Sequence, residues 1–403
     1  MTINKWLALS WLNLIRNGRR SLISGGVIAF GSAALLLSIG YVSATFEGLR
    51  ESTIQGGLGH LQIAAHNGFD DPRAEAISAA QAQQLEQQLQ AMPEVRLTTR
   101  RILFEGLASS GDVTIAVMGR GVDIDQERKI SLFTPIVEGR NLSGQDSGWQ
   151  AVIGDRLARN LGVSVGDSLT LLTNTRYQGI NAIDVTIKGI NRSGIPELDE
   201  RSVMISLAAA SLLTDSDQVS RLVVGLYETA NTDLIADRLQ ADTSISVQRW
   251  IDLFPFYGAV VNLYHSIFGM MGGIILVVVF LSVSNSMLMA FMERVNESGT
   301  LRAFGFSRGR VIGLFSAEGW LLGALGASAG LEIGLLLMLL INQASIPMPP
   351  PPGRSVGYPL VLNVEVLAVP AILAAMMLCG TLAAWLPARR MTAMTITAAL
   401  NHY

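Results

Sequence analysis

The residues that could carry out chemistry in this chain are few and far apart. The four histidines, at positions 60, 66, 265 and 402, are too scattered for a local metal site, and the single cysteine, Cys379, excludes an internal disulfide framework. No lysine follows the glycine spacing of a phosphate-binding loop. We therefore expect no catalytic residue, no metal site and no bound cofactor in this chain, and we expect no nucleic-acid partner.

Two acidic groups and one glycine pair come closest to known binding motifs. Asp123 with Asp125, and the acidic residues within 197–200, could ligate calcium or serve a hydrolase. Neither group has the full spacing of a calcium-binding loop, so we predict solvated acidic loops. Gly119 and Gly121 lack the third glycine and the helix start of a dinucleotide site, which predicts a turn there.

The composition indicates a membrane protein. With 50% hydrophobic residues, 15% charged residues and a mean hydropathy of +0.40, the chain is too apolar for an ordinary soluble domain. Residues 21–46 carry no charge, and a helix of that length reaches about 39 Å, more than the ~30 Å hydrocarbon core. That length favours an uncleaved anchor over a removable signal peptide. We predict four spans, at 21–46, 263–292, 311–342 and 366–387.

The second span is too long for the bilayer alone. Residues 256–292 lack Asp, Glu, Lys and Arg, and a helix of that length reaches about 56 Å. One interpretation is a helix that continues out of the membrane as a stalk, since no proline follows Pro255 in this stretch. The other is a break near Gly258 that leaves a short interfacial segment.

The charges divide the chain between the two sides of the membrane. Residues 47–255 carry a net charge of −9, whereas the rest of the chain carries +6. Arginines such as Arg16, Arg19 and Arg20 concentrate in the short segments at the other ends of the spans. The positive-inside rule therefore places both termini in the cytoplasm and the acidic segment outside.

We expect a membrane protein with four transmembrane α-helices and a large α+β extracytoplasmic domain inserted between helices 1 and 2. In that domain, residues 74–92 predict a helix ended by Pro93, residues 155–161 predict another helix, and alternating runs at 113–117 and 169–172 predict strands. The segments outside the spans are a cytoplasmic amphipathic start (1–20), the extracytoplasmic domain with its stalk (47–262), a cytoplasmic link (293–310), a proline-rich outer loop that predicts a semi-rigid extended cap (343–365) and a cytoplasmic tail (388–403).

The link, residues 293–310, is the most informative stretch of the sequence. Gly299 and Gly305 bracket about one helical turn. Thr300 is placed to cap the start of that turn and Gly305 to end it. Ser307 can then cap the helix that becomes the third span.

A short helix on the cytoplasmic face suits docking to a soluble protein. Leu301 and Phe304 would be available to the partner, and Arg302 could form a charged pair. A plain positive loop that only sets the topology explains the charges equally well.

The sequence of the link is similar to that of a known family. An acidic–basic pair, then Arg-Glu-aliphatic-Gly, then Arg-Ala-x-Gly, is matched by Glu293, Arg294, Glu297, Gly299, Arg302, Ala303 and Gly305. Asn296 and Ser298 depart from the pattern. Residues 151–170 are similar to the Ile-Gly-x-x-Leu-Ala-x-x-Leu-Gly-Val-x-x-Gly-Asp pattern of the same family, and residues 11–20 to its amphipathic lead-in. The chain thus resembles the four-span ABC transporter permeases that include macrolide exporters, lipoprotein-release permeases of the LolC/LolE type and FtsX proteins.

The resemblance implies a permease in the bacterial inner membrane that binds two copies of a separate ATPase, which would hold ATP and magnesium. Other implied partners are a second permease copy or paralogue, membrane lipids, and a lipoprotein or periplasmic protein. Extraction or release of a lipoprotein or lipid-like substrate is the leading function. Drug or peptide efflux by mechanotransmission, and a signalling scaffold that controls a cell-wall hydrolase, are the alternatives. The residues that we assign to ATPase coupling are Glu293, Arg294, Glu297, Gly299, Leu301, Arg302, Ala303, Phe304, Gly305 and Arg308.

The third span contributes two carboxylates and a face of small residues. Glu318 lies about two turns in from the cytoplasm, at a position that the family also uses. Glu332 lies deeper, where a carboxylate usually faces protein or water, and both a structural role at the bundle seam and a transport role are open. Gly323, Gly326 and Gly330 predict a face on which another helix can approach closely.

Overall fold

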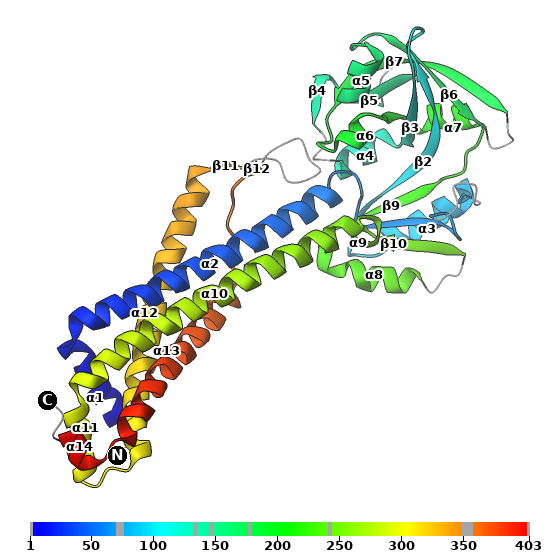
Figure 1. The fold of residues 1–403 in the computed structure, drawn as a ribbon. Helices are drawn as coiled ribbons and strands as arrows, with labels where there is room; N and C mark the ends of the chain where they lie inside the picture. Colours follow the sequence, from blue (N-terminus) through cyan, green and yellow to red (C-terminus); the bar gives the residue numbers. More distant parts are fainter. Residues whose placement is uncertain are drawn as a thin grey trace. The chain divides into compact units, whose positions relative to one another are not determined.

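The chain folds into two compact units (Figure 1). The computed structural model describes residues 3–69, 76–131, 135–144, 148–175, 179–240, 244–348 and 358–400. The helical unit comprises Met1–Glu47, Ala259–Pro347 and Pro359–Tyr403. The α+β unit comprises Gly48–Gly258 and Met348–Tyr358. Residues 349–357 of the predicted proline-rich cap lie outside the described residues.

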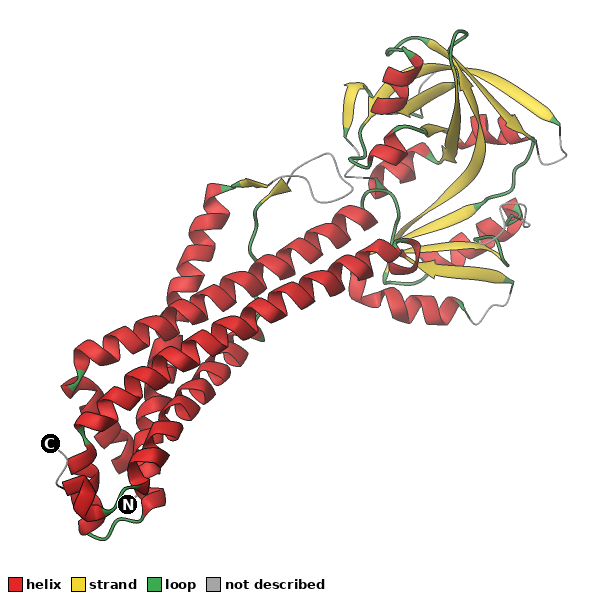
Figure 2. Ribbon diagram, in the orientation of Figure 1, coloured by secondary structure: helices red, strands yellow, loops and turns green. Residues whose placement is uncertain are grey.

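Four helices in the described part of the chain are long and apolar enough to cross a membrane (Figure 2). They are α2 (Gly18–Ile54), α10 (Pro255–Glu293), α12 (Arg308–Ala344) and α13 (Ala368–Ala393). Each overlaps one predicted span. Helix α10 is unbroken at Gly258, so the interpretation of a break there is wrong and the continuous helix holds.

Three shorter helices flank these spans. Helix α1 (Ile3–Arg16) leads into α2 through Asn17 alone, α11 (Val295–Ala303) forms the link, and α14 (Ile396–Leu400) follows α13. Helix α13 continues past Pro387, where the predicted span ended. The short strands β11 (Pro347–Met348) and β12 (Tyr358–Pro359) pair with each other.

Small residues on α12 let two other helices approach it. A Cβ on Gly323 would lie 2.7 Å from the carbonyl oxygen of Met376 in α13, and a Cβ on Gly330 would lie 2.2 Å from the carbonyl oxygen of Ala29 in α2. Gly326 also faces α2. The predicted stripe of small residues therefore contacts two helices in turn: Gly323, nearer the start of α12, faces α13, and Gly326 and Gly330, further along it, face α2.

The α+β unit is built on one mixed sheet, in which the described residues form ten strands. The strand order is β10-β1-β9-β2-β3-β8-β5-β7-β4, and β6 pairs with both β2 and β7. The pairs β3–β8 and β5–β7 are parallel. The strands are β1 (Leu61–Ala65), β2 (Val95–Ser109), β3 (Thr114–Val122), β4 (Ile136–Gly139), β5 (Gln150–Gly154), β6 (Ser168–Asn174), β7 (Ile180–Asn191), β8 (Ser202–Ser206), β9 (Arg221–Leu226) and β10 (Ile245–Arg249).

Two large apolar cores and one smaller cluster, made of Val122, Leu142, Val152 and Met204, hold the described part of this unit together. One lies between α3 (Ala79–Gln90), α8 (Thr232–Leu239) and strands β1, β9 and β10. The other lies between α5 (Asp155–Leu161), α7 (Leu207–Thr214) and strands β3 and β5 to β8. The long strand β2 joins them, since Val95 belongs to the first core and Phe104 to the second. The remaining helical segments are α4 (Ile124–Ile130), α6 (Pro196–Asp199), η1 (Thr229–Asn231) and α9 (Trp250–Leu253).

Local patterns predicted several of these elements. Helix α5 has the predicted bounds, and Gly162 ends it in a left-handed conformation with φ 69°. Helix α3 begins at Ala79, later than predicted, because the side chain of Ser78 accepts a hydrogen bond from the Gln81 backbone N–H and caps the helix there. It ends at Gln90, before Pro93.

The glycine pair that predicted a turn lies inside strand β3 instead. A Cβ on Gly119 would lie 2.0 Å from the ring of Phe104, and a Cβ on Gly121 would lie 2.1 Å from the Cβ of Ala210. These glycines therefore allow close packing rather than a change of direction. Asp123 accepts backbone hydrogen bonds as the N-cap of α4.

Candidate functional site

The predicted link folds as the nine-residue helix α11, longer than the single turn expected. Its N-cap is Arg294, so the predicted start at Thr300 is wrong. The Thr300 hydroxyl donates to the carbonyl oxygen of Asn296 at 3.0 Å, inside the helix. Gly305 ends the helix as predicted, with φ 86°, which favours glycine. Ser307 occupies the N-cap position of α12, but its side chain makes no capping bond.

Two arginines from the N-terminal segment pair with two glutamates at the link. Nη1 and Nη2 of Arg20 lie 3.0 and 2.8 Å from the two carboxylate oxygens of Glu293. Arg16 pairs with Glu297. Both arginines and both glutamates are spaced four residues apart, so the pairs form two rungs between neighbouring helical faces. We refer to these four residues as the ion-pair ladder.

Glu318 on α12 accepts hydrogen bonds from two other helical segments. Nη1 of Arg294 lies 3.1 and 3.0 Å from its carboxylate oxygens, and Nδ2 of Asn13 lies 2.6 Å from one of them. The Arg294 and Glu318 side chains are only 9% and 6% exposed. The Arg294 guanidinium also lies 5.1 Å from the ring centroid of Phe315. A buried charge without a partner is costly, so each group of this cluster restrains the others.

Arg294 and Glu297 are held in their charged forms. Nε of Arg294 donates to Glu297 at 2.7 Å. Burial lowers the pKa of Arg294, but the charge of Glu318 and the bond to Glu297 outweigh it and raise that pKa above its ordinary value. Burial raises the pKa of Glu297, but hydrogen bonds from Arg294 and Arg16 outweigh it and lower that pKa below its ordinary value.

The other end of α11 is connected to the end of α13. Nη1 of Arg302 donates to the carbonyl oxygens of Met394 and Thr392 at 2.6 and 3.3 Å, where helix-end carbonyls lack intrahelical partners. Leu301 packs against the apolar core of the helical unit. Within this chain Arg302 therefore binds backbone carbonyls, and Leu301 is half-buried against the helical unit. Their predicted roles in docking a partner stay predictions.

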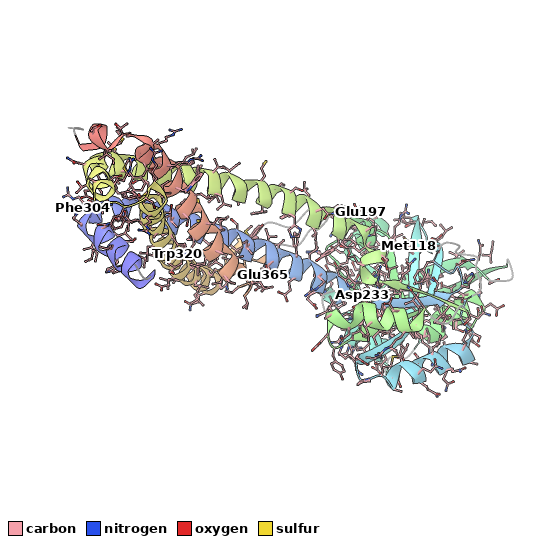
Figure 3. The ribbon with its side chains drawn as sticks, turned by 90° about the horizontal axis from the view of Figure 1, so that it is seen from below. Met118, Glu197, Asp233, Phe304, Trp320 and Glu365 are labelled. Atoms are coloured by element: carbon pink, nitrogen blue, oxygen red, sulfur yellow. The ribbon has the colours of Figure 1, made fainter. Side chains whose placement is uncertain are left out.

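The remaining residues assigned to coupling form an exposed surface, apart from Gly299, which is buried within α11. Ala303, Phe304, Gly305 and Arg308 are exposed, and Phe304 is 80% exposed. Figure 3 shows Phe304 at the end of the helical unit. We refer to residues 303–308 as the link tip. An aromatic side chain beside an arginine suits a partner with an apolar pocket and an acidic rim.

Glu332 is exposed on α12. Among the described residues it has no hydrogen-bond or ion-pair partner, so it does not lie at a seam between the helices of this chain. The structural role at such a seam is therefore wrong for the single chain.

This arrangement suits a mechanical connection. The ladder and the Arg294–Glu318 pair join the link to α1, α2 and α12, and Arg302 joins it to α13. A displacement of the link tip would therefore be passed through these hydrogen bonds and ion pairs to several spans at once.

Across the described ranges, no group of three His, Cys, Asp or Glu side chains could hold a metal ion.

Sequence reasoning did not identify Asn13, Arg16 and Arg20 as residues of this site. It interpreted the arginines only as signals of membrane topology. The four-residue spacing of Arg16 and Arg20 matches that of Glu293 and Glu297, and this complementary spacing is the signal that could have found the ladder.

Comparisons with known proteins cover both units. The model of the FtsX-like permease C-terminal region matches residues 269–396, and that of the MacB-like periplasmic core domain matches residues 21–242. The first match contains the link and most of the residues around it. The second covers more than half of the chain.

Individual relatives are distant. The lipoprotein-releasing system transmembrane protein LolE of Haemophilus influenzae is 23% identical over 306 residues, which cover 69% of this chain and 73% of LolE. LolC of Neisseria meningitidis serogroup B is 25% identical over 241 residues, which cover 57% of this chain and 58% of LolC. The crystal structure of the periplasmic region of MacB from Actinobacillus actinomycetemcomitans aligns with a TM-score of 0.38 and 14% identity over 52% of this chain and 95% of that one.

Proposed function

This chain belongs to the FtsX/MacB-like family of ABC permeases, and we propose that it transmits the motion of a separate ATPase, docked at the link tip, to extract or release a lipoprotein or lipid-like substrate. It is a multi-pass membrane protein whose α+β periplasmic domain lies between its first and second long helices. The family pairs such permeases with an ATPase, and the matched regions contain no ATPase domain.

The observation that carries the docking proposal is the exposure of Phe304. Its side chain is 80% exposed, while Leu301, three residues earlier and within α11, packs against the helical unit. The base of α11 is fixed by the ladder and by Arg294, so the tip projects from a rigid support. A rigid support favours binding, since less side-chain and loop entropy is lost when a partner docks.

The substrate class rests on the relatives. LolE and LolC are named as lipoprotein-releasing proteins, and LolE aligns over most of its length. In the mechanism that we propose, ATP and magnesium bind in the partner ATPase, and a dimer of this chain with itself or with a paralogue carries two such partners. The substrate is engaged at the outer leaflet and handed to a periplasmic acceptor.

The docking proposal is tested with Phe304→Asp in the full-length chain, co-expressed with its ATPase. We expect loss of ATPase co-purification and of permease-dependent ATP hydrolysis, because an Asp cannot fill an apolar pocket and opposes an acidic rim. Val361→Asp is the matched control, since Val361 is also exposed and lies outside the four long helices. Normal co-purification and hydrolysis in Phe304→Asp would overturn the docking site.

Export of a drug or peptide is the second candidate, because the MacB-like periplasmic core domain matches more than half of the chain. Proteoliposomes that contain the permease, its ATPase and a radiolabelled lipoprotein distinguish lipoprotein extraction from drug or peptide export. ATP-dependent transfer of the lipoprotein to a soluble acceptor supports extraction. Lipoprotein retention, together with ATP hydrolysis stimulated by a small apolar compound, supports export.

A further inference from the structure

We propose that the N-terminal helix α1 is part of the moving element, so that a displacement of the link reaches the first span through α1 and the ion-pair ladder. This inference rests on the proposed function, because it assumes that the ATPase moves the link. It assigns a positioning role to Asn13, Arg16 and Arg20.

The ladder joins segments that are more than 270 residues apart in sequence. Arg20 pairs with Glu293 through both terminal nitrogens, a geometry that fixes direction as well as distance. Arg16 pairs with Glu297 one turn away, in the order expected when the two segments run in opposite directions. Two ion pairs one turn apart resist rotation of the N-terminal segment against the link, whereas a single exposed ion pair would allow it.

A third connection is buried. Glu318 accepts from Asn13 of α1 and from Arg294 at the start of α11. If α1 moved away from α11, one of these donors would lose the shared carboxylate. The loss of a buried hydrogen-bond partner carries the full desolvation cost, so the two helices move together.

Helix α1 is stiffly joined to α2. The backbone N–H of Asn17 donates to the carbonyl oxygen of Asn13, and the N–H groups of Arg20 and Ser21 donate to that of Asn17. The Ser21 hydroxyl also donates to the carbonyl oxygen of Leu14 at 3.0 Å. The hydrogen-bonded path is thus continuous across the junction, so α1 passes its displacement to α2 directly.

The competing role for α1 is a passive interfacial anchor. Trp11, Leu12 and Ile15 are exposed on it, as an anchor in the headgroup region requires. An anchor, however, would depend on these apolar side chains and not on the partners of Arg16 and Arg20. The two roles therefore predict different variants to be harmful.

The test uses the full-length chain reconstituted with its ATPase. The substitutions are made in one rung of the ladder, Arg20–Glu293. We expect Arg20→Glu or Glu293→Arg alone to lower permease-dependent ATP hydrolysis by about tenfold, within the usual range of coupling between sites. The swap Arg20→Glu with Glu293→Arg should restore it. Arg19→Glu is the matched control, because Arg19 is exposed on the same turn and makes the same change to the cytoplasmic charge. ATPase co-purification should be normal in all four proteins.

Normal hydrolysis in both single variants, or a swap no better than either one, would overturn the role of α1. If that happens while Phe304→Asp still abolishes docking, the proposed function stands and only this inference fails. If Phe304→Asp docks and hydrolyses normally while the swap rescues, the docking site is wrong and the ladder still transmits.

Discussion

Arg294 and Glu318 form a buried ion pair between the start of α11 and the third span, with Nη1 of the arginine 3.0 Å from one carboxylate oxygen. The residues are 24 positions apart in sequence. Both side chains are buried, and the Phe315 ring and Asn13 lie against them, so the two charges depend on protein groups for their partners. This contact makes the link a part of the bundle rather than a loop attached to it.

Removal of the Glu318 charge should destabilise the chain strongly. Glu318→Gln keeps the shape of the side chain but removes the charge that faces Nη1 of Arg294, so only Glu297, at Nε, remains as a counter-ion of this buried group, and we expect a loss of roughly 3 kcal/mol in unfolding free energy. Thermal unfolding of the detergent-solubilised chain measures it. Glu138→Gln is the control, since Glu138 is exposed on β4, outside the four long helices, and should change stability by less than ~0.5 kcal/mol. Equal effects of the two substitutions would contradict the buried pair.

The contact between α2 and α12 depends on Gly330. Gly330→Ala places a Cβ 2.2 Å from the Ala29 carbonyl oxygen, so one helix must shift, and we expect a loss of about 1–3 kcal/mol in unfolding free energy. Gly26→Ala is the matched control on α2, because a Cβ there meets no atom within 4 Å. It should be neutral or stabilising, since alanine favours a helix. Thermal unfolding that ranks the two variants in the opposite order would show that these helices do not pack as described.

The stability of the α+β unit should fall in mild acid because of His60. Its Nδ1 accepts from the Leu226 N–H at 3.1 Å, and Nε2 lies 3.2 Å from the Thr229 hydroxyl. Burial lowers its pKa from 6.5 to about 4; the charge of Glu51 opposes the shift, and Arg96 adds to it. The unfolded chain therefore binds the proton first, so stability is complete above pH 6.5 and is lost as the pH falls towards 4. The expected loss is roughly 3 kcal/mol.

Thermal unfolding of the full chain, followed through the sheet signal in circular dichroism at several pH values, measures this loss. His60→Asn is the control variant, because its amide oxygen can still accept from Leu226 but cannot take up a proton in this range. The variant should show a flatter dependence on pH between 7 and 4 than the parent. The same slope in both proteins would assign the acid sensitivity to other groups.

Cysteine labelling should place the link and the α+β unit on opposite sides of the membrane. With Cys379 replaced by Ser, single cysteines are introduced at Asp112, in the turn between β2 and β3, and at Thr300 on α11; both sites are exposed. An impermeant maleimide added to intact spheroplasts should label the first and should reach the second only after permeabilisation. Labelling of both in intact spheroplasts would refute the topology.

The sequence alone predicted those elements that depend only on residues close to one another along the chain. Long stretches without charge predict spans, because the hydrocarbon core excludes unpaired charge whatever packs beside it. The bounds of α5, the end of α11 at Gly305 and the separation of acidic and basic segments were likewise readable, since each depends on neighbouring residues alone. The start of α11 was not, because its first residues are fixed by Arg294 and its distant partner Glu318.

Only the tertiary structure decided which side chains meet. Arg20 and Glu293 are 273 residues apart, and local spacing cannot indicate that they pair. Leu301 on α11 and Phe304 at the C-cap of that helix are both apolar, and the surrounding helices alone determine that the first is packed and the second is exposed. Gly119 likewise lies inside a strand paired with β2 and β8, where the Phe104 ring occupies the space that a side chain would need. Each of these outcomes depends on atoms from distant segments, which no local pattern contains.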